Sequence, residues 1–432
     1  MAISTPKSLR NKVMYQIFVR NFSQEGTFEK VRERLGEIKE LGTDIIWLMP
    51  IHPIGRIQRK GSLGSPYAIS DYRAINPEFG TLDDFKALVS DIHAHGMKCM
   101  IDVVYNHTSP DSVLSKEHPE WFYHKEDGGF GNRVGDWTDI IDLDYSDKEL
   151  WRYQIDTLKM WAEIVDGFRC DVAPLIPLEF WLQARKEVEE VREGCIWLSE
   201  SVEPGFITYM RGRGLTALSD SEIYQAFDIS YDYDIYDVFR AYIAGRAKLA
   251  DYAGAINRQE YIYPDNFVKL RFLENHDQTR AAFLIPEYSA LRNWTAFSFF
   301  QKGMAFIYAG QEYGVRHLPS LFDKDTVDFS DKDFNDVFAP FIRRLADIKR
   351  DPIFTDSVYR VKAQDDSFLI ATHEKNGRKA LGVFGLKNSC GYVEVDFPDG
   401  IYTNLIDGEK VEVFRGGIQF FSDPIIIIDQ EL

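Results

Sequence analysis

The sequence has little cysteine, no excess of basic residues and no long apolar run. Its four cysteines are widely scattered among 432 residues and show no metal-ligand spacing, so we expect reduced thiols in a cytoplasmic protein. With 50 Lys and Arg against 68 Asp and Glu, the formal net charge is −18, which disfavours nucleic acid or an anionic membrane as a partner. No stretch approaches the roughly 20 apolar residues of a membrane span, and the first residues do not resemble a secretory leader.

Short apolar runs alternate with amphipathic helical patterns over most of the chain. Strands that are apolar throughout, separated by amphipathic helices, imply a parallel sheet covered on both faces. Eight such units predict a (β/α)8 TIM barrel, with an open doubly wound sheet as the alternative. The expected strands are Val13–Val19, Ile45–Leu48, Lys98–Val103, Gly167–Cys170, Ile196–Leu198, Ile223–Phe227, Val268–Phe272 and Ala305–Tyr308.

Two segments depart from a plain barrel. Residues 108–142 are polar and Gly-rich, too long for an ordinary loop, and predict a short inserted excursion on the catalytic face. Residues 351–432 show the alternation typical of strands, which predicts a C-terminal antiparallel β-sandwich domain. The barrel then comprises residues 1–107 and 143–350. The acidic, tyrosine-rich run Phe227–Phe239 is expected to be a solvated loop at the barrel mouth.

Charged residues follow several of the expected strands. In a barrel, the C-terminal ends of the strands open into one shared mouth, so these side chains should converge. Apolar strands that end in acids are costly unless the acids are paired or used. The converging residues are the acids Asp171, Glu200 and Asp277, with Arg169, His107 and His276 around them.

This arrangement suits cleavage of a glycosidic bond, which requires one carboxylate and one protonated carboxylic acid. Arg169 lies two residues before Asp171 on one strand, so both side chains share a face and Asp171 can remain ionised as a nucleophile. Glu200 follows an apolar run, and burial beside other acids would hold its proton near neutral pH.

Four blocks in order resemble those of a known family. They are DVVYNH from Asp102, GFRCDVA from Gly167, the strand-end Glu200, and ENHD from Glu274. In order and separation they resemble the α-amylase family of retaining glycoside hydrolases and transglycosylases, glycoside hydrolase family 13. The resemblance covers nearly the whole chain, including the excursion and the C-terminal domain.

The resemblance implies a role for each matching position. Asp171 would be the nucleophile that forms a glycosyl-enzyme, and Glu200 the acid and then the base. Asp277 would hold the hydroxyls of the sugar and stabilise the transition state. The implied substrate-binding residues are Tyr67, which stacks under the sugar, His107, Arg169, His276, the supporting Asp102, and Arg280 for a more distal sugar.

One stretch departs from the family pattern. Many α-amylases have Lys-His after the nucleophile block, whereas this chain has Ala173-Pro174-Leu175. Pro174 has no N–H and Leu175 has no polar group, which disfavours both the usual acceptor-side contacts and a structural calcium. Asn106 alone matches a calcium position, and one ligand does not make a site. We therefore expect no required cofactor and assign no metal ligands, and a structural calcium is left as the disfavoured alternative.

The expected function is retaining hydrolysis of α-1,4-glucosidic bonds in malto-oligosaccharides or related α-glucans. The alternatives are a glucanotransferase or an α-glucosidase of the same family, and a non-catalytic sugar-binding protein on the same fold. The expected partner is an oligosaccharide substrate, and the sequence leaves the oligomeric state open.

Overall fold

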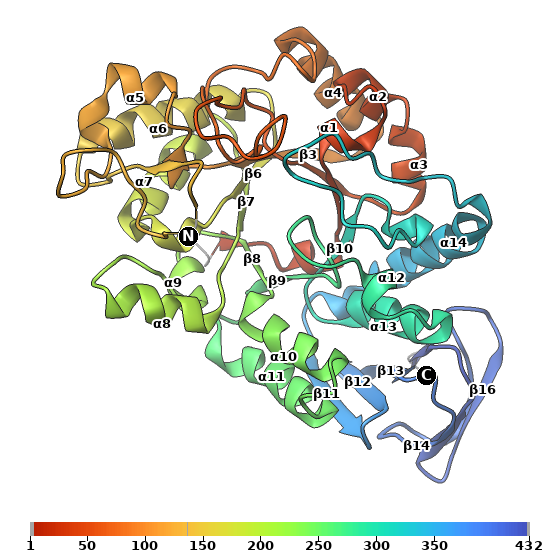
Figure 1. Ribbon diagram of the computed structural model, residues 1–432. Helices are drawn as coiled ribbons and strands as arrows, with labels where there is room; N and C mark the ends of the chain where they lie inside the picture. The colour runs from red at the N-terminus through yellow and green to blue at the C-terminus, as the bar shows by residue number, and fades with distance from the viewer. Residues whose placement is uncertain (1–3, 136, 430–432) are drawn as a thin grey trace.

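The computed structural model describes residues 4–135 and 137–429, and a closed barrel of eight parallel strands lies at its centre (Figure 1). The strand order around the barrel is β1-β10-β9-β8-β7-β6-β3-β2. Apart from Lys98, every residue of these strands is buried, which explains the continuous apolar runs and confirms the predicted TIM barrel. The strands are β1 Val13–Ile17, β2 Ile45–Leu48, β3 Lys98–Val103, β6 Gly167–Cys170, β7 Ile196–Ser199, β8 Ile229–Tyr231, β9 Val268–Arg271 and β10 Met304–Tyr308.

Helices surround the barrel on all sides (Figure 1). The longer helices bury one apolar face, as in α4, where Phe85, Leu88, Val89 and Ile92 are buried. The helices are α1 Val19–Phe22, α2 Phe28–Arg32, α3 Leu35–Glu40, α4 Leu82–Ala94, α6 Lys148–Ala162, α7 Leu178–Glu189, α8 Pro204–Gly212, α9 Asp220–Ile223, α10 Tyr233–Ile243, α11 Leu249–Ile262, α12 Ala281–Leu284, α13 Tyr288–Phe300 and α14 Lys332–Lys349.

The sixth barrel strand is not the predicted segment Ile223–Phe227 but β8, Ile229–Tyr231. The sequence before it starts a helix instead, because the Glu222 carboxylate accepts hydrogen bonds from the backbone N–H and hydroxyl of Ser219 at 2.7 Å each. That reciprocal cap favours the single turn α9 over a strand.

The acidic run Phe227–Phe239 is therefore not a solvated loop, and that expectation was wrong. It contains β8 and most of α10, and three of its four acids, Asp228, Asp232 and Asp234, are paired with cations, whereas Asp237 is exposed. Asp232 lies 2.8 Å from Arg271, and Asp234 lies 2.8 Å from the fully buried Lys269. Lys269 also contacts Asp220. These carboxylates are in the interior because cations of the neighbouring strand β9 compensate them.

The excursion after β3 is compact and stays close to the barrel mouth. Its two-stranded sheet pairs β4 His107–Thr108 with β5 Ile141–Asp142 in antiparallel fashion, and the short helix α5 Val113–Glu117 lies between them. The sheet ties the end of the excursion directly to His107, a residue that the sequence places at the site.

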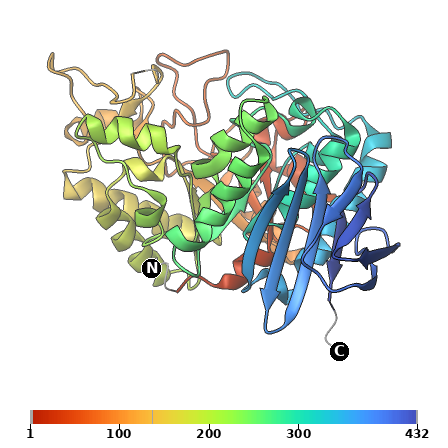
Figure 2. The same ribbon diagram turned by 90° about the horizontal axis from the view of Figure 1, so that it is seen from below.

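The C-terminal region forms two four-stranded antiparallel sheets beside the barrel (Figure 2), as predicted. The first sheet packs on α13, where the Phe384 ring lies 5.4 Å from Phe297 and 5.6 Å from Phe300. A separate apolar cluster fills the space between the two sheets. The strands are β11 Val358–Gln364, β12 Phe368–Lys375, β13 Arg378–Gly385, β14 Gly391–Glu394, β15 Gly400–Thr403, β16 Lys410–Phe414, β17 Gly417–Phe420 and β18 Ile425–Ile428.

In the described ranges, the helices are all too short or too polar to cross a membrane. The cysteines are free thiols, with Cys99, Cys170 and Cys195 buried and Cys390 exposed.

Replacing Lys269 by Met should destabilise the barrel strongly. The change leaves Asp220 and Asp234 buried without their cation, and breaking a buried ion pair costs about 3–5 kcal/mol. Urea unfolding followed by circular dichroism measures the loss. A triple variant that also carries Asp220→Asn and Asp234→Asn removes the uncompensated charges and should recover part of it. Equal stability of Lys269→Met and the parent would contradict this account.

Candidate active site

One buried guanidinium connects three of the predicted acids. Arg169, on β6, donates through Nη1 to Asp102 Oδ1 at 2.8 Å and to Asp171 Oδ1 at 2.7 Å. Its Nη2 lies 2.9 Å from Glu200 Oε2. Strand register explains the arrangement, because Arg169 pairs with Asp102 on β3 and with Leu198 on β7. Neighbouring strand ends thus direct all three carboxylates to one cation.

The backbone after Asp171 is strained in a way that serves Glu200. Val172 has φ 34° and ψ 42°, in the left-handed region that a β-branched residue rarely adopts. The N–H of the same residue donates to Glu200 Oε2 at 2.9 Å. Strain of this kind persists only where the surroundings hold it, and it gathers at functional sites.

Burial and the Arg169 guanidinium act in opposite directions on the pKa of Glu200 and of Asp171. Burial raises the pKa of Glu200 well above its usual range, with Arg169 opposing the rise and Asp171 adding to it. Burial also raises the pKa of Asp171 to about 7, and here too Arg169 opposes the rise. Arg169 thus offsets part of the burial cost at Asp171 without cancelling it, since it is shared among three carboxylates. At Glu200 the direction of the shift favours the protonated acid that a proton donor must be.

A second group of hydrogen-bonded side chains lies beside the carboxylates around Arg169. His276 Nε2 lies 2.6 Å from Tyr67 Oη and 3.0 Å from Asp277 Oδ2. Tyr67 donates its hydroxyl to Asp102 Oδ2 at 3.1 Å, and its ring stacks on His276 with centroids 5.5 Å apart. Gln16, on β1, contacts the other ring nitrogen of His276 at 2.8 Å. The side chain of Asp277 is 39% exposed, so it faces the open mouth.

His107 completes the group on the excursion side. Its Nε2 lies 4.0 Å from Asp171 Oδ2, and its ring packs 5.6 Å from that of Trp137. The hydroxyl of Tyr72 donates to the His107 carbonyl at 2.7 Å and fixes the backbone there.

Arg280 does not reach the mouth, which corrects the expectation that it contacts a distal sugar. It is fully buried, and its Nη1 donates to Glu274 Oε1 at 2.6 Å while its Nη2 donates to the Ala309 carbonyl at 2.9 Å. Its donors are used inside the protein, so it supports the strand end that carries His276 and Asp277.

Sequence reasoning missed Gln16 and the strain at Val172. A signal for Gln16 was present, since an amide within the apolar run Val13–Ile17 is costly unless it is bonded. No sequence signal gives the φ angle of Val172.

A family model for the alpha-amylase catalytic domain matches residues 7–359, and a model for the bacterial alpha-amylase C-terminal domain matches residues 360–427. The chain belongs to the alpha-amylase family. This confirms the resemblance drawn from the four sequence blocks.

Comparison with individual proteins gives the same family. The crystal structure of an alpha-amylase from Lactobacillus plantarum matches with a TM-score of 0.94 and 47% identity, over 98% of this chain and 100% of that one. Alpha-amylase MalA of Haloarcula japonica is 28% identical over 325 residues, 72% of this chain and 45% of its own. An alpha-1,4-glucan:maltose-1-phosphate maltosyltransferase of Rhodospirillum rubrum is 39% identical over 197 residues, 41% of this chain and 28% of its own. The chain thus spans less than half the length of these two curated relatives.

The residues around Asn106 do not suit the calcium ion found in many family members. Asp142 is the nearby carboxylate, and one of its oxygens accepts a hydrogen bond from the Arg133 backbone at 2.6 Å. The Arg133 guanidinium lies 3.7 Å from that same oxygen and donates to the Leu143 carbonyl at 3.1 Å. A protein cation already stands beside the carboxylate, and no cluster of three or more His, Cys, Asp or Glu side chains that could hold a metal occurs among the described residues.

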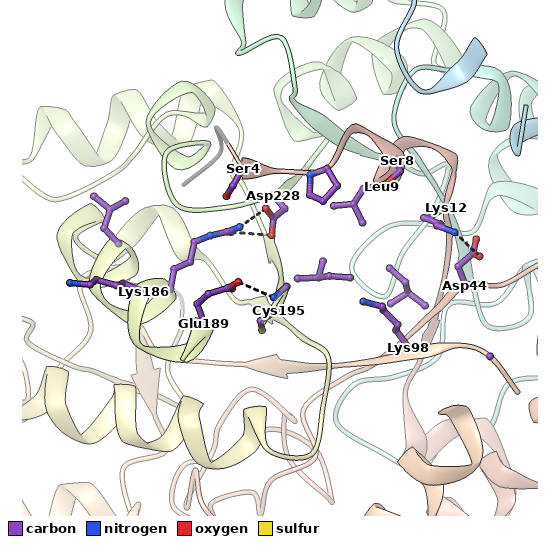
Figure 3. Close-up of a pocket in the computed structure, with 17 residues that line it drawn as sticks. Ser4, Ser8, Leu9, Lys12, Asp44, Lys98, Lys186, Glu189, Cys195 and Asp228 are labelled. Atoms are coloured by element: carbon purple, nitrogen blue, oxygen red, sulfur yellow. Dashed lines mark hydrogen bonds and ion pairs between the residues drawn. The ribbon is translucent and has the colours of Figure 1, made fainter. Parts of the chain in front are cut away.

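A separate cavity of about 820 Å³ opens at the other end of the barrel (Figure 3). It is lined by the first residues of three strands, Ile45, Lys98 and Ile196, whereas the acids follow the last residues. Several of its charged groups are already paired, Lys12 with Asp44 and Arg185 with Asp228. The cavity is therefore distinct from the site that this alpha-amylase family member builds at its C-terminal strand ends.

Glu200 should be protonated in the resting protein at pH 7. Because burial raises its pKa, the infrared difference spectrum between the parent and Glu200→Gln should show the loss of a carboxylic-acid C=O stretch. Glu189→Gln, on the opposite face, is the matched control and should leave the Glu200 C=O stretch in place. Loss of carboxylate bands alone in Glu200→Gln would show that the acid is ionised and would contradict the electrostatic argument.

Proposed function

We propose that this protein hydrolyses α-1,4-glucosidic bonds in malto-oligosaccharides, with retention, through a covalent glycosyl-enzyme. The observation that carries the proposal is the sharing of Arg169 by Asp102, Asp171 and Glu200. A shared cation places an ionisable nucleophile and a proton donor side by side at one barrel mouth, which is what retaining cleavage needs.

In the first step, Asp171 attacks the anomeric carbon, and the bond to the leaving oxygen breaks as Glu200 gives that oxygen its proton. Glu200, now a carboxylate, then takes a proton from water as the water oxygen attacks the same carbon and releases Asp171. Asp277, exposed at the mouth, is placed to hold the sugar hydroxyls as positive charge develops on the ring.

Two further features support the substrate class and location. The relatives named above include alpha-amylases and an enzyme named for its action on alpha-1,4-glucan. The free cysteines, three of them buried, suit a reducing, cytoplasmic environment in which the substrates are soluble oligosaccharides.

The second candidate function is glucan transfer at the same site. A maltosyltransferase relative and the apolar Pro174-Leu175 stretch, which replaces polar acceptor-side residues, favour it. A transferase would pass the glycosyl group from Asp171 to a sugar hydroxyl instead of water.

Turnover of maltoheptaose over time, analysed by product length and reducing ends, tests the proposal. Shorter products with rising reducing ends indicate hydrolysis, and products longer than the substrate indicate transfer. Asp171→Asn should lower kcat by about 10³-fold or more, because no glycosyl-enzyme forms. Glu200→Gln should lower kcat less for an α-maltoside with an activated aryl leaving group than for maltoheptaose, because that leaving group needs no proton.

Glu189→Gln serves as the control for these variants and should retain full turnover. If Glu200→Gln lowers kcat equally for both substrates, Glu200 is not the general acid. Undiminished turnover by Asp171→Asn would refute the mechanism.

We further propose that no calcium ion is required, because the Arg133 guanidinium supplies the positive charge beside Asp142. Turnover and melting temperature should both be unchanged by a chelator and by added calcium. Arg133→Met should lower the melting temperature, since the excursion loses its bonds to Asp142 and Leu143. One oxygen of Asp142 has no hydrogen-bond partner within residues 4–135 and 137–429, so a chelator-induced loss of turnover that calcium restores would overturn the proposal.

A further inference from the structure

Gln16 places an amide in the buried wall of the barrel. Its side chain is fully buried, and its Nε2 lies 2.8 Å from His276 Nδ1. Its Oε1 has no hydrogen-bond partner among the described residues. Burying an unpaired polar atom costs free energy, and leucine would avoid that cost. The contact with His276 is therefore what distinguishes glutamine from an apolar residue at this position.

The ring of His276 is enclosed by groups from several elements. Gln16 from β1 faces Nδ1, and Asp277 from its own loop lies 3.0 Å from Nε2. Tyr67 stacks on the ring, and Trp47 from β2 packs edge-on at 5.8 Å. The charged groups beyond these are Asp102, reached through Tyr67, and Arg169.

Burial lowers the pKa of His276 to about 4, with Asp277 opposing the shift. The ring is therefore neutral at pH 7 and carries one proton, on either Nδ1 or Nε2. Which nitrogen bears it decides what the ring offers to its neighbours.

The contacts at Nε2 place the proton there. Tyr67 has a single hydroxyl hydrogen, which it donates to Asp102, so its oxygen accepts in the 2.6 Å contact with Nε2. A bare Nε2 would also set its lone pair against the Asp277 carboxylate at 3.0 Å. With the proton on Nε2, Nδ1 is an acceptor and needs a donor, which the Nε2–H of Gln16 provides.

We propose that Gln16 is a positioning residue that holds His276 in the Nε2–H tautomer, so that the ring keeps a donor toward Tyr67 and Asp277. The assignment of the tautomer stands on the contacts alone, whereas its kinetic consequence rests on the proposed function. Gln16 itself acts only through His276.

Gln16→Glu reverses the polarity of this contact. A carboxylate can only accept, so it draws a proton onto Nδ1 and favours the doubly protonated ring. At low pH that ring still carries the Nε2–H, and the variant should approach the parent. As pH rises, the ring loses one proton, the carboxylate retains the one on Nδ1, and the donor toward Tyr67 and Asp277 disappears. The ratio of variant to parent kcat/KM should therefore fall with rising pH.

Nitrogen-15 NMR of the histidine side chains tests the tautomer without any substrate. The chain has nine histidines, and the signals absent from His276→Gln identify His276. We expect the parent to show Nε2–H with a bare Nδ1, and Gln16→Glu to shift the proton to Nδ1. A parent spectrum with the proton on Nδ1 would overturn the proposal, whether or not the protein turns over α-glucans.

Kinetics on maltoheptaose supply the second readout. Gln16→Leu should lower kcat/KM by about tenfold, the cost of a missing donor to a buried acceptor, without the pH-dependent ratio expected for Gln16→Glu. Gln301→Leu is the matched control, since Gln301 is also buried but precedes β10 at the opposite end of the barrel, and it should match the parent. A constant ratio for Gln16→Glu across pH would show a merely structural role and overturn the proposal. If Gln16→Leu does not fold, the spectra of the parent and the pH ratio of Gln16→Glu still decide.

Discussion

The site depends on one guanidinium that is held inside the barrel wall. Arg169 has no solvent to compensate its charge, so it must be surrounded by carboxylates. The carboxylates in turn are tolerated at buried strand ends because that cation is there. Removing the guanidinium would leave several acids close together in a low dielectric, where most could not ionise. Burial raises the pKa of both Asp171 and Glu200, and the shared positive charge of Arg169 opposes the rise at each.

Buried cations also compensate buried carboxylates at β9, but there the pairs have a structural role. Lys269 and Arg271 on β9 each meet buried aspartates from the preceding segment. These pairs hold the segment around β8 against β9. A buried ion pair therefore does not by itself mark a site. The convergence of three carboxylates on Arg169 and the exposure of Asp277 make the difference.

The two hydrogen-bond networks meet at Asp102. One of its oxygens accepts from Arg169 and the other from Tyr67, so the Arg169 cluster and the Tyr67–His276 network share a carboxylate. Through Tyr67 and His276 the connection extends to Gln16 at the far wall of the barrel. A strand with no acidic or basic residue, β1, thus contributes to the site through an amide.

The apolar runs and the charges that follow them were enough to predict the barrel, the C-terminal sheets and the convergence of the strand-end carboxylates. Buried strands can be recognised in the sequence from their continuous apolar runs. Acids placed directly after such runs indicate a site, because burying an unpaired carboxylate costs free energy. The prediction failed at β8, where the Ser219–Glu222 cap outweighed the apolar run, and at Asp232 and Asp234, whose cations lie on β9. That Arg280 is buried, that Arg133 lies beside Asp142 and that Gln16 contacts His276 emerges only from the folded chain. The reason is physical: burial and pairing depend on which strands become neighbours, and 260 positions separate Gln16 from His276 along the chain.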